Sequence, residues 1–199
     1  MNRRAIVHAA WRLALGLGVG RGLLQGMTAS AAGFGLDELE QRLRADTRRE
    51  VRFHETRESP WLATPAESRG TLVASPDGSL EKRAETPRPE TWRLRQDRLE
   101  RIGPDGEIVG TVSYENFPAL GIMARAMREG IAGRLDALQG EFTLRLQGTP
   151  ERWTLELLPR AAAASRHVER VELQGDATGL RTLVVVERNG ARTSTYLLD

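Results

Sequence analysis

Residues 117–138 read FPALGIMARAMREGIAGRLDAL, in a chain that otherwise alternates apolar and polar residues over short runs. Apolar residues recur in this segment at steps of three and four, the spacing of one face of an α-helix. The stripe consists of Leu120, Met123, Met127, Ile131, Leu135 and Leu138. The charged residues fall largely outside it. The pattern therefore predicts an amphipathic helix over residues 117–138, entered through a proline that the first helical turn tolerates.

Short alternating runs on both sides of this helix have the period of half-buried strands. We expect a first helix at 35–45 and strands at 50–57, 69–74, 79–85, 90–95, 98–102, 107–114, 141–147, 153–157, 166–173, 180–187 and 191–198. Turn sequences such as Asn189-Gly190 keep the connections short, and no βαβ rhythm appears. The sequence thus predicts an α+β fold with a largely sequential antiparallel sheet of about 10–11 strands.

A single apolar helix between two blocks of strands has to pack on a curved sheet. Two roles remain open for it. If the helix covers a concave apolar face, the protein can hold a lipid; if it only fills a core, the chain is an ordinary α+β domain. Met123 and Met127 suit adaptable contact with flexible acyl chains. Gly121, Gly130 and Gly133 each weaken the helix by up to about 1 kcal/mol, which fits a movable cover or close packing on the sheet.

The first residues have the pattern of an export signal. Arg3-Arg4 gives a basic start, residues 5–26 are mostly apolar or small, and Ala29-Ser30-Ala31 offers the small residues that a signal peptidase reads. We therefore predict a cleaved signal peptide over residues 1–31, a single domain over residues 32–199 and a periplasmic location. An amphipathic first helix is the alternative, and two arginines leave Sec and twin-arginine export both open.

The charge balance argues against a nucleic-acid partner. The chain has 29 basic and 27 acidic residues, and four of the basic residues but no acidic one fall within residues 1–31, so residues 32–199 carry a net charge of −2. This mixed charge is typical of a solvated surface. The absence of cysteine excludes disulfides, thiolate metal sites and attachment through an N-terminal lipidated cysteine. We expect a monomer that binds no nucleic acid.

Catalytic motifs are absent from the sequence. His54 lies beside Glu55, but adjacent residues on a strand point to opposite faces, so we expect both to face solvent rather than form one site. His167 has no partner at metal-ligand spacing. No G-x-S-x-G elbow, phosphate-binding loop or dinucleotide fingerprint is present. The sequence therefore predicts no catalytic residue, no metal and no cofactor.

The order of elements and several short strings resemble the periplasmic lipoprotein carrier family, LolA and its relatives. The strings are VRFHE at 51–55, RGTL at 69–72, LQGEF at 138–142 and WTLELLP at 153–159, and the resemblance covers nearly all of residues 34–198. It implies an unclosed β-barrel whose hydrophobic concavity is covered by helices. It also implies that lipoprotein acyl chains are received from an inner-membrane transporter and passed to an outer-membrane receptor. The family's carrier holds its cover with an arginine before a proline, whereas Ser75 precedes Pro76 here.

These observations predict a periplasmic half-barrel carrier that binds acyl chains and shuttles them towards the outer membrane. The expected lipid contacts are the inward strand residues and the helix stripe: Phe53, Leu72, Trp92, Phe142, Leu144, Trp153, Leu155, Met123, Met127 and Ile131. A lipid or envelope-stress sensor that regulates a membrane partner is the alternative. A hydrolase acting on envelope material would require a polar cluster in the cavity.

Overall fold

The computed structural model describes residues 34–46 and 48–198. The expected signal peptide and its boundary with the domain lie outside these residues and stay predictions. No helix in the described ranges has both the length and the apolar character needed to cross a membrane.

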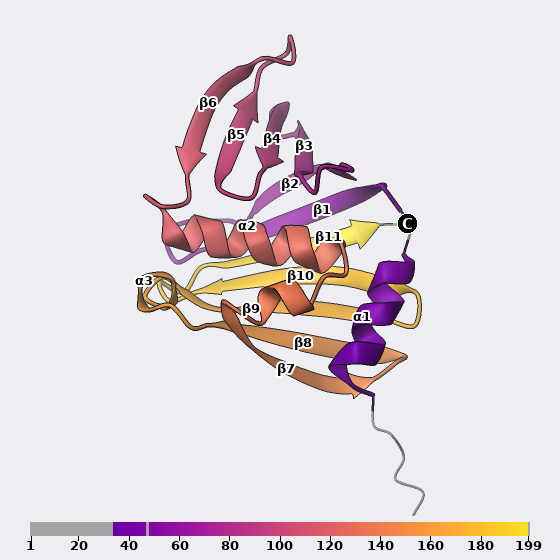
Figure 1. The fold of residues 1–199 in the computed structure, drawn as a ribbon. Helices are drawn as coiled ribbons and strands as arrows, with labels where there is room; N and C mark the ends of the chain where they lie inside the picture. Colours follow the sequence, from indigo (N-terminus) through magenta and orange to yellow (C-terminus); the bar gives the residue numbers. More distant parts are fainter. Residues whose placement is uncertain (1–33, 47, 199) are drawn as a thin grey trace, which may run out of the picture. The chain divides into compact units, whose positions relative to one another are not determined.

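Eleven strands and three α-helices make up the described part of the chain (Figure 1). The helices are α1 (Leu36–Ala45), α2 (Pro118–Ile131) and α3 (Ala162–Ser165), and a 3₁₀ turn, η1, covers Asp136–Leu138. The strands are β1 (Glu50–Glu58), β2 (Ala66–Ala74), β3 (Leu80–Thr86), β4 (Glu90–Leu94), β5 (Arg98–Ile102), β6 (Ile108–Ser113), β7 (Phe142–Thr149), β8 (Arg152–Pro159), β9 (Val168–Asp176), β10 (Gly179–Glu187) and β11 (Arg192–Leu198). The predicted α+β class and strand number are confirmed. The short α3 was not predicted.

All eleven strands belong to one antiparallel sheet, in the order β6-β5-β4-β3-β2-β1-β11-β10-β9-β8-β7. Consecutive strands are neighbours within β1–β6 and within β7–β11, and the first strand pairs with the last in the centre, as in Phe53 opposite Leu197. The edge strands β6 and β7 do not pair with each other, so the sheet is an unclosed barrel, as predicted.

The segment that joins the two edge strands, residues 114–141, contains α2. The 14 residues of this helix cover about 21 Å at 1.5 Å per residue. Figure 1 shows the sheet curved, with α2 lying across its inner face.

The central helix is shorter than its apolar spacing predicts. It ends at Ile131, and Gly133 then takes a left-handed conformation with φ +65°, so the prediction of one helix to residue 138 is wrong. Leu135 and Leu138 are buried, but outside α2: Leu135 lies directly before η1, and Leu138 is its last residue. A left-handed residue breaks the helical hydrogen-bond ladder, while the apolar spacing continues past it.

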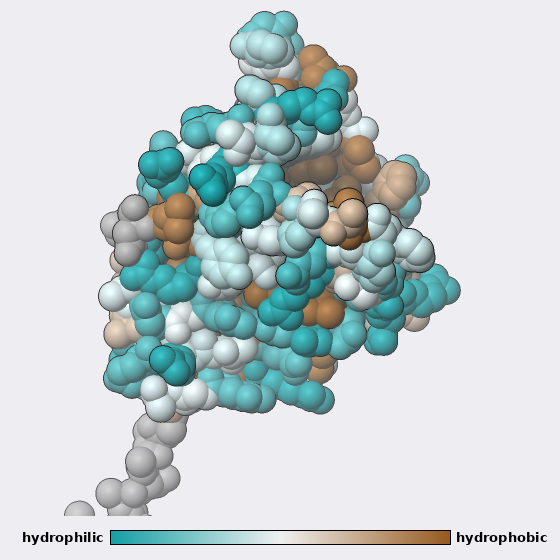
Figure 2. Space-filling view, turned by 180° about the vertical axis from the view of Figure 1, so that it is seen from behind, coloured by the Kyte–Doolittle hydropathy of each residue, from teal (hydrophilic) through white to brown (hydrophobic). Residues whose placement is uncertain are grey.

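The core lies on the inner face of the sheet. Phe53, Leu72, Phe142 and Leu155 are all buried there, at 1% exposure or less. The face seen from behind is mostly hydrophilic, with a few apolar patches (Figure 2).

Candidate functional site

A cavity of about 270 Å³ lies between α2 and the inner face of the sheet. The sheet contributes residues from β1, β3, β4, β5, β10 and β11 to its wall, so both halves of the sheet take part. The apolar lining consists of Leu120, Met123, Ala124, Met127, Trp92, Leu94, Leu99, Leu183 and Val185. Most of the exposed surface inside the cavity is therefore apolar.

The two sides of α2 have different roles. Ile122 and Ala126 are buried, and a Cβ atom at Gly130 would approach Leu173 of β9 to 2.9 Å, so this side packs closely against protein. Met123 and Met127 lie on the adjoining side, where they line the cavity, are only half-buried and also pack against the core. The apolar stripe identified in the sequence is therefore shared between cavity and core. Leu120, Met123 and Met127 form the roof of the cavity, whereas Ile131 packs against the core.

Polar residues form one side of the cavity wall. Lys82 Nζ lies 2.6 Å from each carboxylate oxygen of Glu55, and Thr195 donates its hydroxyl hydrogen to Glu55 Oε2 at 2.7 Å. Farther along β1, Arg57 forms an ion pair with Glu187 at 2.9 Å. Arg57 and Lys82 are both cavity-lining cations, and each is matched by a carboxylate.

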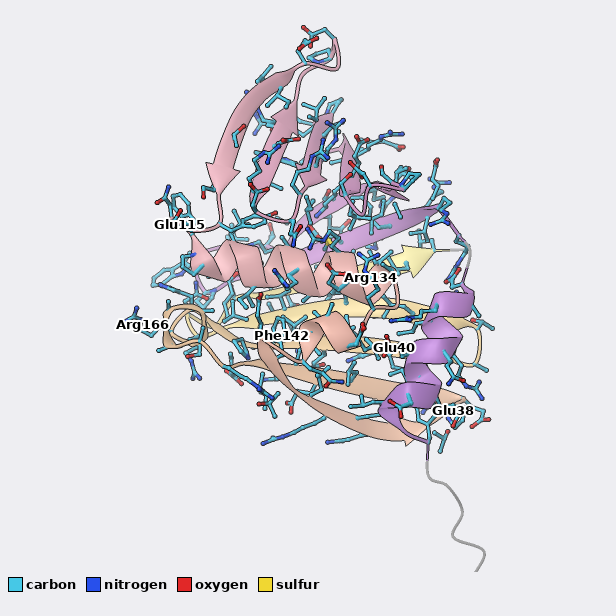
Figure 3. All side chains as sticks on the ribbon, viewed as in Figure 1. Glu38, Glu40, Glu115, Arg134, Phe142 and Arg166 are labelled. Atoms are coloured by element: carbon cyan, nitrogen blue, oxygen red, sulfur yellow. The ribbon has the colours of Figure 1, made fainter. Side chains whose placement is uncertain are left out.

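Ion pairs hold α2 in place near its middle and at its C-terminal end. Arg125 pairs with Glu141 at 2.9 Å, just before β7. Glu129 is buried and accepts hydrogen bonds from Arg128 at 2.7 Å and from Arg134 at 2.6 Å (Arg134 is labelled in Figure 3). Burial raises the pKa of Glu129, but the bonds from Arg134 and Arg128 outweigh burial and hold this pKa below its ordinary value. Arg125 thus links α2 to the segment before β7, and Arg134 links the end of α2 to the connection that follows it.

The ten residues predicted to contact lipid occupy two environments. Trp92, Met123 and Met127 line the cavity. The others do not line it: Phe53, Leu72, Phe142, Trp153 and Leu155 are buried in the core, and Leu144 and Ile131 pack against that core while half-buried. Phe142, labelled in Figure 3, lies at the start of β7. Sequence alternation identifies the inner face of a strand, but core and cavity residues share that face.

The polar wall of the cavity was not predicted. Glu55 was expected to face solvent, but its side chain is only 15% exposed and points to the inner face, so this expectation is wrong. His54 lies on the opposite face, with Nε2 3.5 Å from Glu67, as strand alternation requires. The position of Glu55, two residues after Phe53 on one strand, was the available signal.

Within the part of the chain that the structure describes, no group of three potential metal-ligating His, Asp or Glu side chains occurs. The polar side chains of the cavity wall are bonded to one another. The arrangement provides a small apolar space with a charge-neutral polar side.

Solved structures with similarity to this chain show low sequence identity. A LolA superfamily protein from Nitrosomonas europaea is 10% identical over 81% of this chain and 90% of its own, with a TM-score of 0.42. A chain in the structure of the Pseudomonas aeruginosa MucA/MucB complex is 12% identical over 81% of this chain and 53% of its own (TM-score 0.39). LprF from Mycobacterium bovis is 11% identical over 82% and 90% (TM-score 0.36).

A search of curated proteins finds no match. The family model described as outer membrane lipoprotein carrier protein LolA-like matches residues 28–198, which is most of the chain and all of the sheet. The chain belongs to this LolA-like family.

Proposed function

We propose that the protein is a periplasmic carrier that holds an acyl chain of a lipoprotein or another lipid in the cavity under α2 and shuttles it towards the outer membrane. The observation that carries this proposal is the orientation of the helix stripe. Met123 and Met127 meet a cavity, while Ile122, Ala126 and Gly130 on the adjoining side of α2 pack against protein. A helix that only filled a core would leave no free space beside its large apolar side chains, whereas Met123 and Met127 border a cavity of about 270 Å³.

The size and lining of the cavity fit a single flexible chain. Its volume of about 270 Å³ lies just below the usual range of ligand pockets, which favours one acyl chain over several. Each methylene removed from water contributes about 0.8 kcal/mol, so ten of them contribute about 8 kcal/mol. Methionine side chains adapt to such chains without selecting one shape.

The polar residues of the wall do not favour catalysis. The hydroxyl group that bonds Glu55 belongs to Thr195. This residue is 1% exposed, which leaves no room for a substrate carbonyl beside the hydroxyl. Both oxygens of the Glu55 carboxylate are bonded to Lys82, and one of them also accepts the bond from Thr195. We therefore propose binding without a reaction. An inner-membrane transporter and an outer-membrane receptor complete the proposed route.

Native mass spectrometry of the exported protein, purified without detergent, tests this proposal. Co-purified lipid or acylated peptide is the expected result. A mass without ligand, together with no binding of a hydrophobic dye, would contradict it. Met127→Asp places a charge in the roof of the cavity and should weaken dye and lipid uptake by about tenfold or more while the protein stays folded. Gln139→Asp adds the same charge at an exposed position and should bind as the wild type does.

A further inference from the structure

A second, more polar recess of about 360 Å³ adjoins the cavity. Both spaces are lined by Glu55, Lys82 and Trp92, which stand at their common boundary. The recess adds Arg88 and Glu90, one charge of each sign. A ligand with its chain under α2 can therefore extend past the ion pair into the recess, with the bond between chain and head group beside Glu55 and Lys82.

The ion pair at this boundary is held by sheet register. Lys82 lies opposite Leu72 on one side and Trp92 on the other, so all three project to the inner face. Its Nζ is also 5.0 Å from the centre of the Phe53 ring. The Glu55 and Lys82 side chains are only 15% and 20% exposed. Removing two charges from water costs several kcal/mol per ion, and apolar residues at such positions are often at least as stable. This cost suggests a role beyond folding.

The hydrogen bonds within the Glu55–Lys82 pair determine which ligand groups it can bind. An ammonium group has three donors, and the two oxygens of Glu55 take two of them. The third donor is left for an acceptor on a ligand. A neutral carbonyl oxygen can take it without disturbing the pair. A free carboxylate would meet Glu55 as a like charge, and drawing Lys82 away would leave Glu55 buried with Thr195 alone.

Building on the proposed carrier function, we infer that the Glu55–Lys82 pair selects acyl chains joined through a neutral ester or amide and disfavours free fatty acids. The other cavity-lining cation supports this, because Arg57 is matched by Glu187. The polar wall of the cavity therefore presents no unmatched positive charge that would attract a carboxylate. The apolar space beside this wall still suits the acyl chain.

The test compares two competitors with the same chain, monododecanoylglycerol and dodecanoate, each displacing a bound hydrophobic dye from the full chain at neutral pH. The measured quantity is the ratio of their affinities, which does not depend on the affinity of the dye. The wild type should prefer the glyceride. Glu55→Gln keeps the size of the side chain but leaves Lys82 unmatched, so the preference for the glyceride should fall about tenfold.

Two further variants make the outcome decisive. Lys82→Met leaves Glu55 unmatched and should raise the preference for the glyceride, whereas Glu55→Gln should lower it. Glu67→Gln makes the same charge change as Glu55→Gln at a side chain that is 58% exposed, and its ratio should equal that of the wild type. If Glu55→Gln does not fold, the inference is tested by whether the affinity ratio of Lys82→Met rises or falls relative to the wild type.

The inference is overturned if Glu55→Gln and Glu67→Gln give the same ratio, if Lys82→Met lowers it, or if the wild type prefers dodecanoate. Dye displacement by both competitors would still support the carrier function in each of these cases. A wild type that binds neither the dye nor either competitor instead refutes the carrier function, and this inference with it.

Discussion

A Cβ atom at Gly133 would lie 2.6 Å from the carbonyl carbon of Leu43, so the turn after α2 rests directly on the backbone at the end of α1. Gly133 also has φ +65°, a conformation that L-residues adopt at a cost. The Nε atom of Arg44 donates to the Gly133 carbonyl oxygen at 3.2 Å. One glycine therefore ends α2 and joins it to the first helix.

Gly133→Ala should lower the free energy of unfolding by about 2–5 kcal/mol, since the left-handed conformation and the close contact both penalise a methyl group. Urea unfolding measures the change. Gly106 has a similar φ, +85°, but a Cβ atom there would have no neighbour within 4 Å. Gly106→Ala should therefore lower the free energy of unfolding by only about 1–2 kcal/mol. Gly140→Ala has neither constraint and should be nearly neutral. Equal losses at Gly133 and Gly106 would contradict close packing against α1.

The stability of the protein should fall in acid because of buried carboxylates. Glu100 is 0% exposed and bonds Arg98 and Arg95 at 2.8 and 3.3 Å. Burial raises the pKa of Glu100, but bonds from Arg95 and Arg98 outweigh it and lower the pKa from 4.5. The ionised group therefore stabilises the fold above the unfolded pKa, and this contribution disappears as the pH falls through the folded pKa.

Glu100→Gln should cost about 1.5–3 kcal/mol at neutral pH and make the loss of stability below about pH 4.5 less steep. Denaturant unfolding at a series of pH values measures both effects. Glu85→Gln, an exposed position on β3, is the matched control. An acid profile identical to that of the wild type would show that Glu100 is not a source of the acid sensitivity.

Filling the cavity should block uptake without adding a charge. Ala124 lines the cavity from α2 and is 5% exposed, so the larger side chain of Ala124→Leu would occupy part of the cavity. Dye binding should weaken by about tenfold or more. Ala137→Leu, at an exposed position of η1, should bind as the wild type does. Unaltered binding by a folded Ala124→Leu protein would place the ligand elsewhere.

Trp92 should report the bound chain directly. It lines both the cavity and the recess, so an acyl chain brominated near its carbonyl end should quench its fluorescence. Trp92→Phe should remove most of the quenching. Trp61→Phe should retain it, because Trp61 is 80% exposed in the loop between β1 and β2. Quenching that survives Trp92→Phe would contradict the proposed position of the chain.

The strands were predictable because a period of two survives in short runs such as β8. The end of α2 was not, since the spacing of Leu135 and Leu138 continues beyond a glycine whose conformation is set by its contact with α1. The lining of the cavity was only partly predictable. Met123 follows the same helical spacing in a core or under a roof, and only the position of the neighbouring strands distinguishes the two.

The pairing of β1 with β11 has a consequence for the order of folding. Phe53 and Leu197 are neighbours in the centre of the sheet but lie near opposite ends of the described chain. Their pairing therefore carries a large loop-closure entropy cost. Each half of the sheet is built from local hairpins that can form earlier. The cavity takes its wall from both halves and from this central pair. The cavity is therefore complete only once β11 is in place, and the proposed ligand binding would itself report completed folding.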